Sequence, residues 1–120
     1  MKDYQLGVVE SRFADIIWEN EPVSSAVLCK KSEELLGWKK STTYTVLKRL
    51  CEKQIFENDN GTVSSLLSRE DFYSARSKKI VEEEFDGSLP AFLAAFTKSK
   101  KLTASEIKEL REIIDNHKED

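Results

Sequence analysis

The chain has 120 residues, of which 34% are charged and 39% hydrophobic, and its formal net charge is −3 at pH 7. This length accommodates one ordinary domain, or one small domain with a helical extension, and the composition is that of a folded, soluble protein. A uniformly basic surface that binds nucleic acid indiscriminately is excluded by the acidic balance, whereas a local basic segment is not.

The sequence lacks the patterns expected of a membrane, secreted or metal-binding protein. It has no apolar run of about 18 residues and no cleavable N-terminal signal, so we expect a cytoplasmic protein without membrane contact. Cys29 and Cys51 are lone cysteines, which in a reducing compartment are more often structural than disulfide-bonded or redox-sensing. His117 is the single histidine, and no catalytic triad or phosphate-binding glycine loop occurs. We therefore expect no metal, no cofactor and no enzymatic activity.

An amphipathic helix is predicted over residues 5–19. Its apolar stripe consists of Val9, Phe13, Ile16 and Ile17. Trp18 lies beside that stripe and is expected to close a second side of a small core. Pro22 ends the helix, because a proline disfavours the helical conformation of the residue before it.

A second helix is predicted to run from a serine cap, at Ser24 or Ser25, to Leu36, and Gly37 suits the position that follows its last turn. Its buried residues are expected to be Leu28, Leu35 and Leu36. Only residues 37–40 separate it from the next helix. Two helices joined by a short, glycine-containing turn are typical of a helix-turn-helix.

The stretch of residues 38–54, which contains the third predicted helix, carries the functional prediction. Its core-facing stripe consists of Thr43, Val46, Leu47 and Leu50. Residues 39–53 contain five Lys or Arg and one acid, a local charge of +4. Outward hydroxyls and basic groups suit a DNA major groove, since hydroxyls reach base edges or phosphates and Lys or Arg neutralises phosphate. The residues expected to contact DNA are Lys39, Lys40, Ser41, Thr42, Tyr44, Thr45, Lys48 and Arg49. The alternative is an ordinary surface helix, because basic solvated faces are common.

Two short strands, residues 55–57 and 62–67, are predicted to form a β-hairpin around a turn at residues 58–61. Helix, helix-turn-helix and hairpin is the order of a winged helix. The wing has no Lys or Arg between Ile55 and Ser68, so we expect it to bind little phosphate. The predicted fold class is mainly α, an α+β winged helix in residues 1–69 followed by a three-helix dimerisation tail in residues 70–120.

The tail is predicted to contain one helix that begins at Ser68, a second capped by Ser88 with Pro90 in its first turn, and a third opened by a capping box at Thr103 and Glu106. Three short helices cannot bury this much apolar surface among themselves. We expect a twofold-symmetric homodimer formed by the tails; the alternative is a tail packed on its own winged helix. The expected interface residues are Phe85, Leu89, Phe92, Leu93, Phe96, Ile107, Leu110 and Ile114.

Several motifs resemble those of the penicillinase-repressor and methicillin-resistance-repressor family, which includes copper-responsive repressors, and the likeness spans residues 5–118. The motifs are Ile16-Ile17-Trp18-Glu19, Gly37-Trp38, Ser41-Thr42-Thr43-Tyr44-Thr45-Val46-Leu47-Lys48-Arg49-Leu50, Lys53, the turn Asn60-Gly61, Asp86-Gly87-Ser88-Leu89-Pro90, and Leu102-Thr103 with Glu106-Ile107 and Leu110.

The resemblance implies a dimeric winged-helix repressor that binds double-stranded dyad operators, often ahead of β-lactam resistance genes. By position, Ser41, Thr42 and Thr45 would face the bases, and Lys40, Lys48 and Arg49 the bases or the DNA backbone. In the β-lactam systems a membrane sensor leads to cleavage of the repressor. The resemblance therefore implies a sensor-linked protease as a further partner, with the cleaved bond between Ala95 and Phe96.

The chain departs from the family pattern at several positions. Ala95 replaces the asparagine of the cleavage site, which counts against induction by proteolysis. Gln54 replaces the glycine that follows the recognition helix, and Thr43 stands where an apolar residue is usual. Gly7 and Val8 stand where the family has a polar pair that caps the first helix. Residues 62–65 replace an aromatic, basic wing strand, and the tail lacks the cysteines of the copper-responsive repressors. The alternative function is a winged-helix protein-interaction module with weak or lost DNA binding.

Overall fold

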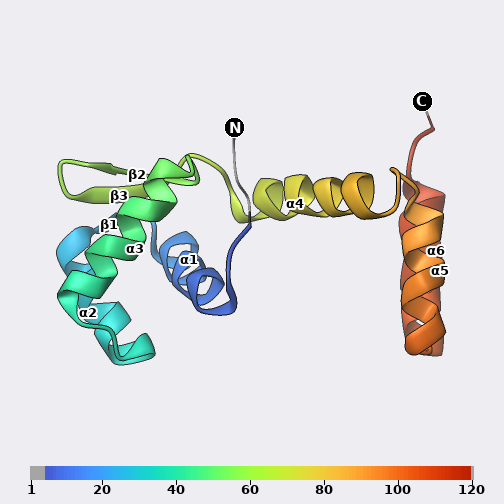
Figure 1. Cartoon of the computed structure of the whole chain (residues 1–120), viewed down its shortest axis with the longest axis horizontal. Coiled ribbons are helices and arrows are strands. Elements are labelled where there is room, and N and C mark those ends of the chain that lie inside the picture. The colour runs from blue at the N-terminus through green and yellow to red at the C-terminus, as the bar shows by residue number, and fades with distance from the viewer. Residues whose placement is uncertain (1–4, 120) are drawn as a thin grey trace. The chain divides into compact units, whose positions relative to one another are not determined.

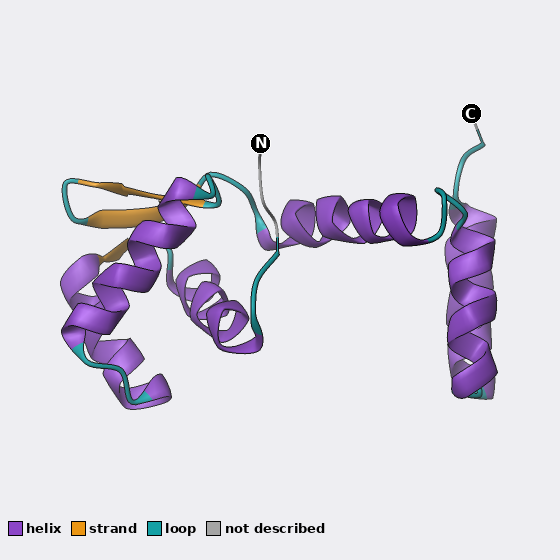
Figure 2. Cartoon of the chain, in the orientation of Figure 1, coloured by secondary structure: helices purple, strands orange, loops and turns teal. Residues whose placement is uncertain are grey.

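The computed structural model describes residues 5–119 and contains helices with one small sheet (Figures 1 and 2). In chain order the elements are α1 (Val8–Asn20), β1 (Val23–Ser24), α2 (Ser25–Leu36), α3 (Lys40–Glu52), β2 (Phe56–Asp59), β3 (Thr62–Ser65), α4 (Arg69–Glu84), α5 (Leu89–Ser99) and α6 (Ala104–Asn116). This order confirms the predicted α+β winged helix followed by a helical tail.

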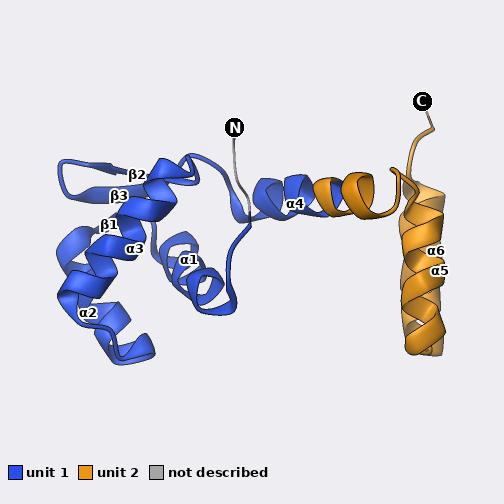
Figure 3. Cartoon of the chain, in the orientation of Figure 1, with its two compact units in different colours: residues 1–78 blue, residues 79–120 orange. Residues whose placement is uncertain are grey.

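The chain divides into two compact units, and the division falls inside α4 (Figure 3). Unit 1 comprises residues 1–78 and contains α1 to β3 with the first part of α4. Unit 2 comprises residues 79–120 and contains the end of α4 with α5 and α6.

The core of unit 1 lies among the first three helices and the sheet. Its fully buried large side chains are Phe13, Ile17, Leu28, Leu50, Ile55, Phe56, Val63 and Phe72. Trp18 is half-buried and packs against this core, with its ring 5.2 Å from that of Phe56 and 5.5 Å from that of Phe72. The predicted second side of the core is therefore confirmed.

The sheet has three antiparallel strands in the order β1-β3-β2. The hairpin turn is Asn60-Gly61, with φ of 52° and 92°, the conformation that an Asn-Gly pair adopts most readily in a two-residue hairpin. The prediction placed Asn58 in this turn, but it pairs with Val63 within the sheet. The two-residue strand β1 was predicted as a connection; Val23 instead pairs with Val63, which joins the start of α2 to the wing.

Two details of the first helices differ from the prediction. α1 begins at Val8 rather than residue 5, because Leu6 is buried in the core and Gly7 is extended. The predicted stripe residue Val9 is consequently 49% exposed. In α2 the side chain of Leu35 is 58% exposed and Ser32 is buried in its place, since positions 28, 32 and 36 follow one helical face.

The predicted caps of α2, α5 and α6 are confirmed. The Ser24 hydroxyl accepts the Val27 amide at 3.1 Å, and Gly37 takes the left-handed conformation with φ 70° after α2. Ser88 accepts the amide of Ala91 at 3.1 Å in the tail. Thr103 and Glu106 form a reciprocal capping box, and the hydrogen bonds from Thr103 lower the pKa of the Glu106 carboxyl.

Candidate nucleic-acid interface

α3 presents one buried face and one exposed face. Its buried residues are Thr43, Val46, Leu47 and Leu50, which confirms the predicted stripe. The exposed residues from the predicted DNA face are Lys39, Lys40, Ser41, Thr42, Tyr44, Thr45, Lys48 and Arg49. The Thr43 hydroxyl donates to the Lys39 carbonyl at 3.4 Å, so a polar residue is accommodated at a position that is usually apolar.

The turn between α2 and α3 is held by aromatic packing. Trp38 lies in this turn, and its ring is 5.1 Å from that of the fully buried Phe13 of α1. Its amide also donates to the Ser32 carbonyl at 3.4 Å. These contacts fix the start of α3 against α1 and α2. The first turn of α3, with its free amide groups, remains at the surface.

Tyr44 and Ser25 together connect α3, α2 and the wing turn. Its hydroxyl lies 3.3 Å from the Ser25 hydroxyl at the start of α2, and the Ser25 amide donates to the Gly61 carbonyl of the wing turn at 2.8 Å. The Lys40 ammonium lies 6.0 Å from the centre of the Tyr44 ring, at the limit of a cation–π contact. Tyr44 therefore contacts α2 as well as lying on the predicted DNA face, a contact that the sequence did not indicate.

Two of the five basic residues counted between positions 39 and 53 point toward the N-terminal part of the chain. Arg49 lies 3.6 Å from the Glu10 carboxylate of α1, and the Lys53 ammonium donates to the Gln5 carbonyl at 2.8 Å. The lysines left on the exposed face are Lys39, Lys40 and Lys48. Sequence reasoning missed Glu10, because an acid in the first turn of a helix is expected to serve that helix alone.

Glu10 does serve α1 as well. One of its carboxylate oxygens accepts the Gly7 amide at 3.3 Å, which offsets the polar cap that Gly7 cannot provide. The other oxygen faces Arg49. The Glu10 side chain thus caps the start of α1 and neutralises the charge of Arg49 near the end of α3.

The wing beside α3 is acidic. Glu57 and Asp59 are exposed on β2, and no Lys or Arg balances them in the hairpin.

A cavity of about 350 Å³ lies between α3 and β2, and Lys48, Cys51 and Asn58 are among the residues that line it. Burial raises the pKa of the Cys51 thiol, and the charge of Glu57 raises it further. The thiol is therefore protonated at neutral pH, which is unlike a reactive, redox-sensing cysteine.

Unit 2 leaves several large apolar side chains exposed. None of the described residues 79–119 is buried. The exposed fractions among the predicted interface residues are 63% for Leu89, 43% for Phe96, 37% for Ile107 and 65% for Ile114. The others, Phe85, Phe92, Leu93 and Leu110, are half-buried.

The half-buried residues pack within unit 2. The ring of Phe92 lies 5.3 Å from that of Phe85 and 6.4 Å from that of Phe96. α5 and α6 lie side by side, and a cavity of about 270 Å³ opens between them, lined mainly by apolar residues such as Leu93 and Leu110. The predicted cleavage position lies inside helix α5, where Ala95 and Phe96 are both exposed.

Within residues 5–119, no helix is long and apolar enough to cross a membrane. The same part of the chain holds no cluster of three or more metal-binding side chains.

Comparison with known proteins places the chain in a family. The sequence profile of the penicillinase repressor family matches residues 6–116. The methicillin resistance regulatory protein MecI of Staphylococcus aureus strain Mu50 is 26% identical over 117 residues, which cover 94% of this chain and 95% of MecI. The penicillinase repressor of Bacillus licheniformis is 23% identical over 118 residues, which cover 95% of this chain and 92% of that repressor. The chain therefore belongs to the penicillinase repressor family, whose members are transcriptional regulators rather than enzymes.

Proposed function

We propose that the chain is a homodimeric, cytoplasmic transcriptional repressor that occupies a dyad operator in double-stranded DNA. Unit 1 binds DNA, and unit 2 forms the dimer. The observation that carries this proposal is α3, whose buried stripe is fixed in a core while hydroxyls and lysines cover its exposed face. Repression then follows from steric occupation of a promoter.

The exposed face of α3 is chemically suited to one half-site. Ser41 and Thr42 lie in the first turn of the helix, where free backbone amides add partial positive charge toward phosphate. Thr45 donates its hydroxyl to the Ser41 carbonyl at 2.9 Å, so its methyl group and hydroxyl oxygen remain available to a base edge. Lys39, Lys40 and Lys48 supply phosphate contacts, and Arg49 joins them only if it leaves Glu10.

The exposed apolar face of unit 2 supports the homodimer. Ile114 and Leu89 expose about two thirds of their surface in the single chain, a state that costs hydrophobic free energy in water. A second copy of the same helices buries these side chains symmetrically. A twofold axis also places two copies of α3 on half-sites about one helical turn apart, or a small multiple of that distance.

The names of the relatives support a gene class. Since they are called methicillin resistance regulatory protein and penicillinase repressor, we propose that this chain controls genes for resistance to β-lactam antibiotics. For release by a sensor-linked protease, the bond proposed is Ala95–Phe96. Its helical conformation within α5 requires that the helix open locally before a protease can cut it.

The test is fluorescence anisotropy of the purified full-length protein on a labelled duplex from its own promoter. A shuffled duplex of equal length is the comparison, and both are measured at two salt concentrations. We expect a preference of ~10³-fold or more for the promoter, with affinity that falls steeply with salt as counterions are released. Equal, weak binding to both duplexes would contradict the proposal for that promoter.

Lys48→Ala sharpens this test. Loss of one phosphate contact should weaken binding to both duplexes alike and reduce the salt slope by about 0.9 per half-site. Lys108→Ala, in the exposed surface of α6, removes the same charge from unit 2 and should leave both quantities unchanged. Equal effects of the two substitutions would show that α3 does not face the DNA.

A second candidate function is a winged-helix protein-interaction module with weak DNA binding. The acidic wing and the engagement of Arg49 and Lys53 favour it. This module would show no preference for the promoter duplex at either salt concentration, and Lys48→Ala would change nothing.

A further inference from the structure

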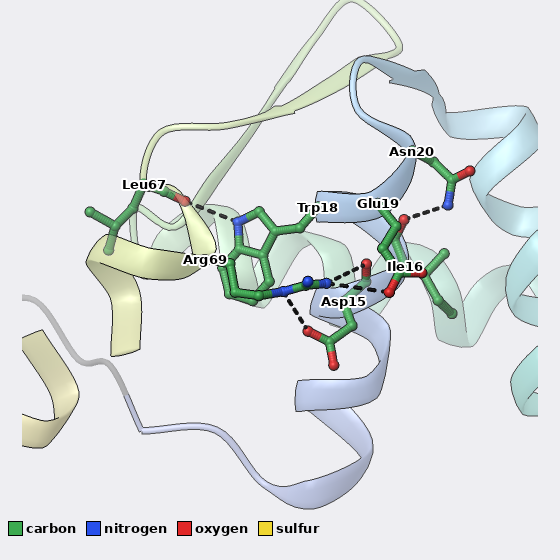
Figure 4. Close-up of polar contacts among 7 residues, drawn as sticks. All are labelled: Asp15, Ile16, Trp18, Glu19, Asn20, Leu67 and Arg69. Carbon is green, nitrogen blue, oxygen red and sulfur yellow. Dashed lines mark hydrogen bonds and ion pairs between the residues drawn. The ribbon is translucent and has the colours of Figure 1, made fainter. Parts of the chain in front are cut away.

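A cluster of polar contacts fixes the first turn of α4 to α1 (Figure 4). The Arg69 guanidinium lies 3.1 Å from the Asp15 carboxylate and 3.4 Å from that of Glu19. It also donates to the Asp15 carbonyl at 3.4 Å and lies 5.7 Å from the centre of the Trp18 ring. Arg69 therefore meets both carboxylates and the indole on one face of α1.

Three features of this cluster indicate orientation rather than stability. The Arg69 side chain is 44% exposed, and exposed ion pairs contribute little to folding. The planar guanidinium can hold two carboxylates in one geometry, which a flexible ammonium cannot. Asp15 and Glu19 are one turn apart, so they repel each other unless a cation lies between them.

An apolar contact beside this polar cluster stabilises the packing of α4 on α1. Phe72 of α4 is fully buried, and its ring lies 5.5 Å from that of Trp18. The Trp18 indole N–H donates to the Leu67 carbonyl at 3.0 Å, just before α4 begins. The neighbouring Tyr73 also contacts this indole, with its ring 6.4 Å from that of Trp18. Both aromatic contacts are made to Trp18, so the helix can still tilt about them, whereas Arg69, one turn earlier, is a further point of attachment that resists the tilt.

The length of α4 makes such a tilt consequential. The helix has 16 residues, which span about 24 Å at 1.5 Å per residue. A tilt of ~10° about its first turn displaces its far end by ~4 Å, close to the rise of ~3.4 Å per base pair of DNA. α4 begins in unit 1 and ends in unit 2, so this displacement lies on the path between α3 and the proposed dimer surface.

We propose that Arg69 is a positioning residue, which sets the direction of α4 and thereby the half-site spacing that the dimer prefers. This inference rests on the proposed function, since it requires a dimer on a dyad operator. Arg69 itself contacts no DNA in this role. It acts through Asp15 and Glu19, which define the angle at which α4 leaves the winged helix.

The first experiment compares full-length wild type, Arg69→Ala and Arg69→Lys on dyad duplexes whose half-site spacing changes in steps of one base pair. Arg76→Ala removes the same charge from the same helix and is the matched control. Wild type and Arg76→Ala should prefer one spacing. Arg69→Ala should bind a single half-site within about twofold of wild type but lose about tenfold on the preferred dyad, with a broader spacing profile, and Arg69→Lys should lie between them. An unchanged profile in Arg69→Ala overturns the proposal.

A second measurement needs no DNA. Spin labels at Glu33→Cys in α2 and Glu83→Cys in α4, with Cys29 and Cys51 replaced by serine, give the distance between α2 and the far end of α4 by dipolar electron paramagnetic resonance. This distance changes when α4 tilts. Dilution with unlabelled chain isolates the distance within one chain, and circular dichroism verifies the fold of each variant. The distance distribution should be narrow in the labelled chain that keeps Arg69 and in its Arg76→Ala variant. It should be broad in the Arg69→Ala variant.

The two readouts separate the inference from the function on which it rests. Equal distributions in all variants overturn the positioning role, even if the protein binds its operator. A broadening confined to Arg69→Ala and Arg69→Lys supports that role, even if no tested duplex is bound and the proposed function fails.

Discussion

Arg49, the only arginine of α3, lies 3.6 Å from Glu10 of α1. The facing carboxylate oxygen of Glu10 is buried and has no hydrogen-bond partner among the described residues. The Arg49 side chain is 53% exposed, so it can exchange this partner for a phosphate at little cost in burial. In the proposed DNA complex, Glu10 would therefore compete with phosphate for the one arginine of α3.

Glu10→Gln should strengthen DNA binding. The substitution removes the competing charge, so Arg49 becomes available for a phosphate and the salt slope should steepen by about 0.9 per half-site. Anisotropy titrations at several salt concentrations measure both quantities. Glu33→Gln, an exposed glutamate of α2, controls for the change in net charge. In an Arg49→Ala background the gain from Glu10→Gln should vanish; a gain that persists there would show that Arg49 is not its cause.

Gln54→Gly should stabilise the protein. Gln54 follows α3 with φ 64°, a left-handed conformation that costs a residue with a Cβ atom roughly 1–2 kcal/mol. Glycine avoids this strain but loses more entropy on folding, so a net gain of about 0.5–1 kcal/mol is expected. Urea unfolding measures it. Gln54→Ala keeps the Cβ atom and should bring no such gain, and equal stabilities of the two variants would contradict the strain.

A fragment that ends at residue 78 should fold as a monomer. It retains Phe72, which is fully buried in unit 1, and lacks the proposed dimer surface. A fragment that ends at residue 70 lacks this ring, and loss of a buried phenylalanine costs about 3–5 kcal/mol. Light scattering gives the oligomeric state, and urea unfolding gives the stability. A dimer of residues 1–78 would refute dimerisation through unit 2, and equal stabilities would refute the structural role of Phe72.

Ile114→Glu should weaken the proposed homodimer without unfolding the chain. Ile114 is 65% exposed in the single chain, so a carboxylate is tolerated there, whereas burial of that charge between two copies is costly. The dimer dissociation constant should rise by about tenfold or more, which corresponds to about 1.4 kcal/mol. Sedimentation measures it, with Lys108→Glu on α6 as the control. Equal constants for Ile114→Glu and wild type would place the interface elsewhere.

Cys51 should react slowly with an alkylating reagent at neutral pH. Burial, and then the charge of Glu57, raise the pKa of its thiol, and the thiolate is the reactive form. The rate should therefore rise with pH later for the folded chain than for the same chain in urea. Glu57→Gln removes the second cause and should move this rise toward lower pH. Time courses by mass spectrometry give the rate, and alkylation at neutral pH as fast as in urea would restore Cys51 as a candidate sensor.

The features that sequence determined here are those governed by neighbouring residues. The stripe of α3 follows from helical periodicity, and the ends of α2, α5 and α6 follow from caps at Ser24, Ser88 and Thr103. The Asn60-Gly61 turn follows from the ease with which both residues adopt positive φ. Each rests on interactions within a few positions along the chain, so the order of these elements already indicated a winged helix with a helical tail.

Tertiary structure alone decided which partners meet across the fold. The pairing of Val23 with Val63 made a strand of residues that have no strand pattern of their own. The contact of Arg49 with Glu10, and that of Arg69 with Asp15, joins charges from distant parts of the chain. A charged residue on an exposed face has the same local pattern whether it meets a carboxylate or a phosphate. Only the packing of α1 against its neighbours brings these acids within reach, and that packing depends on the whole core.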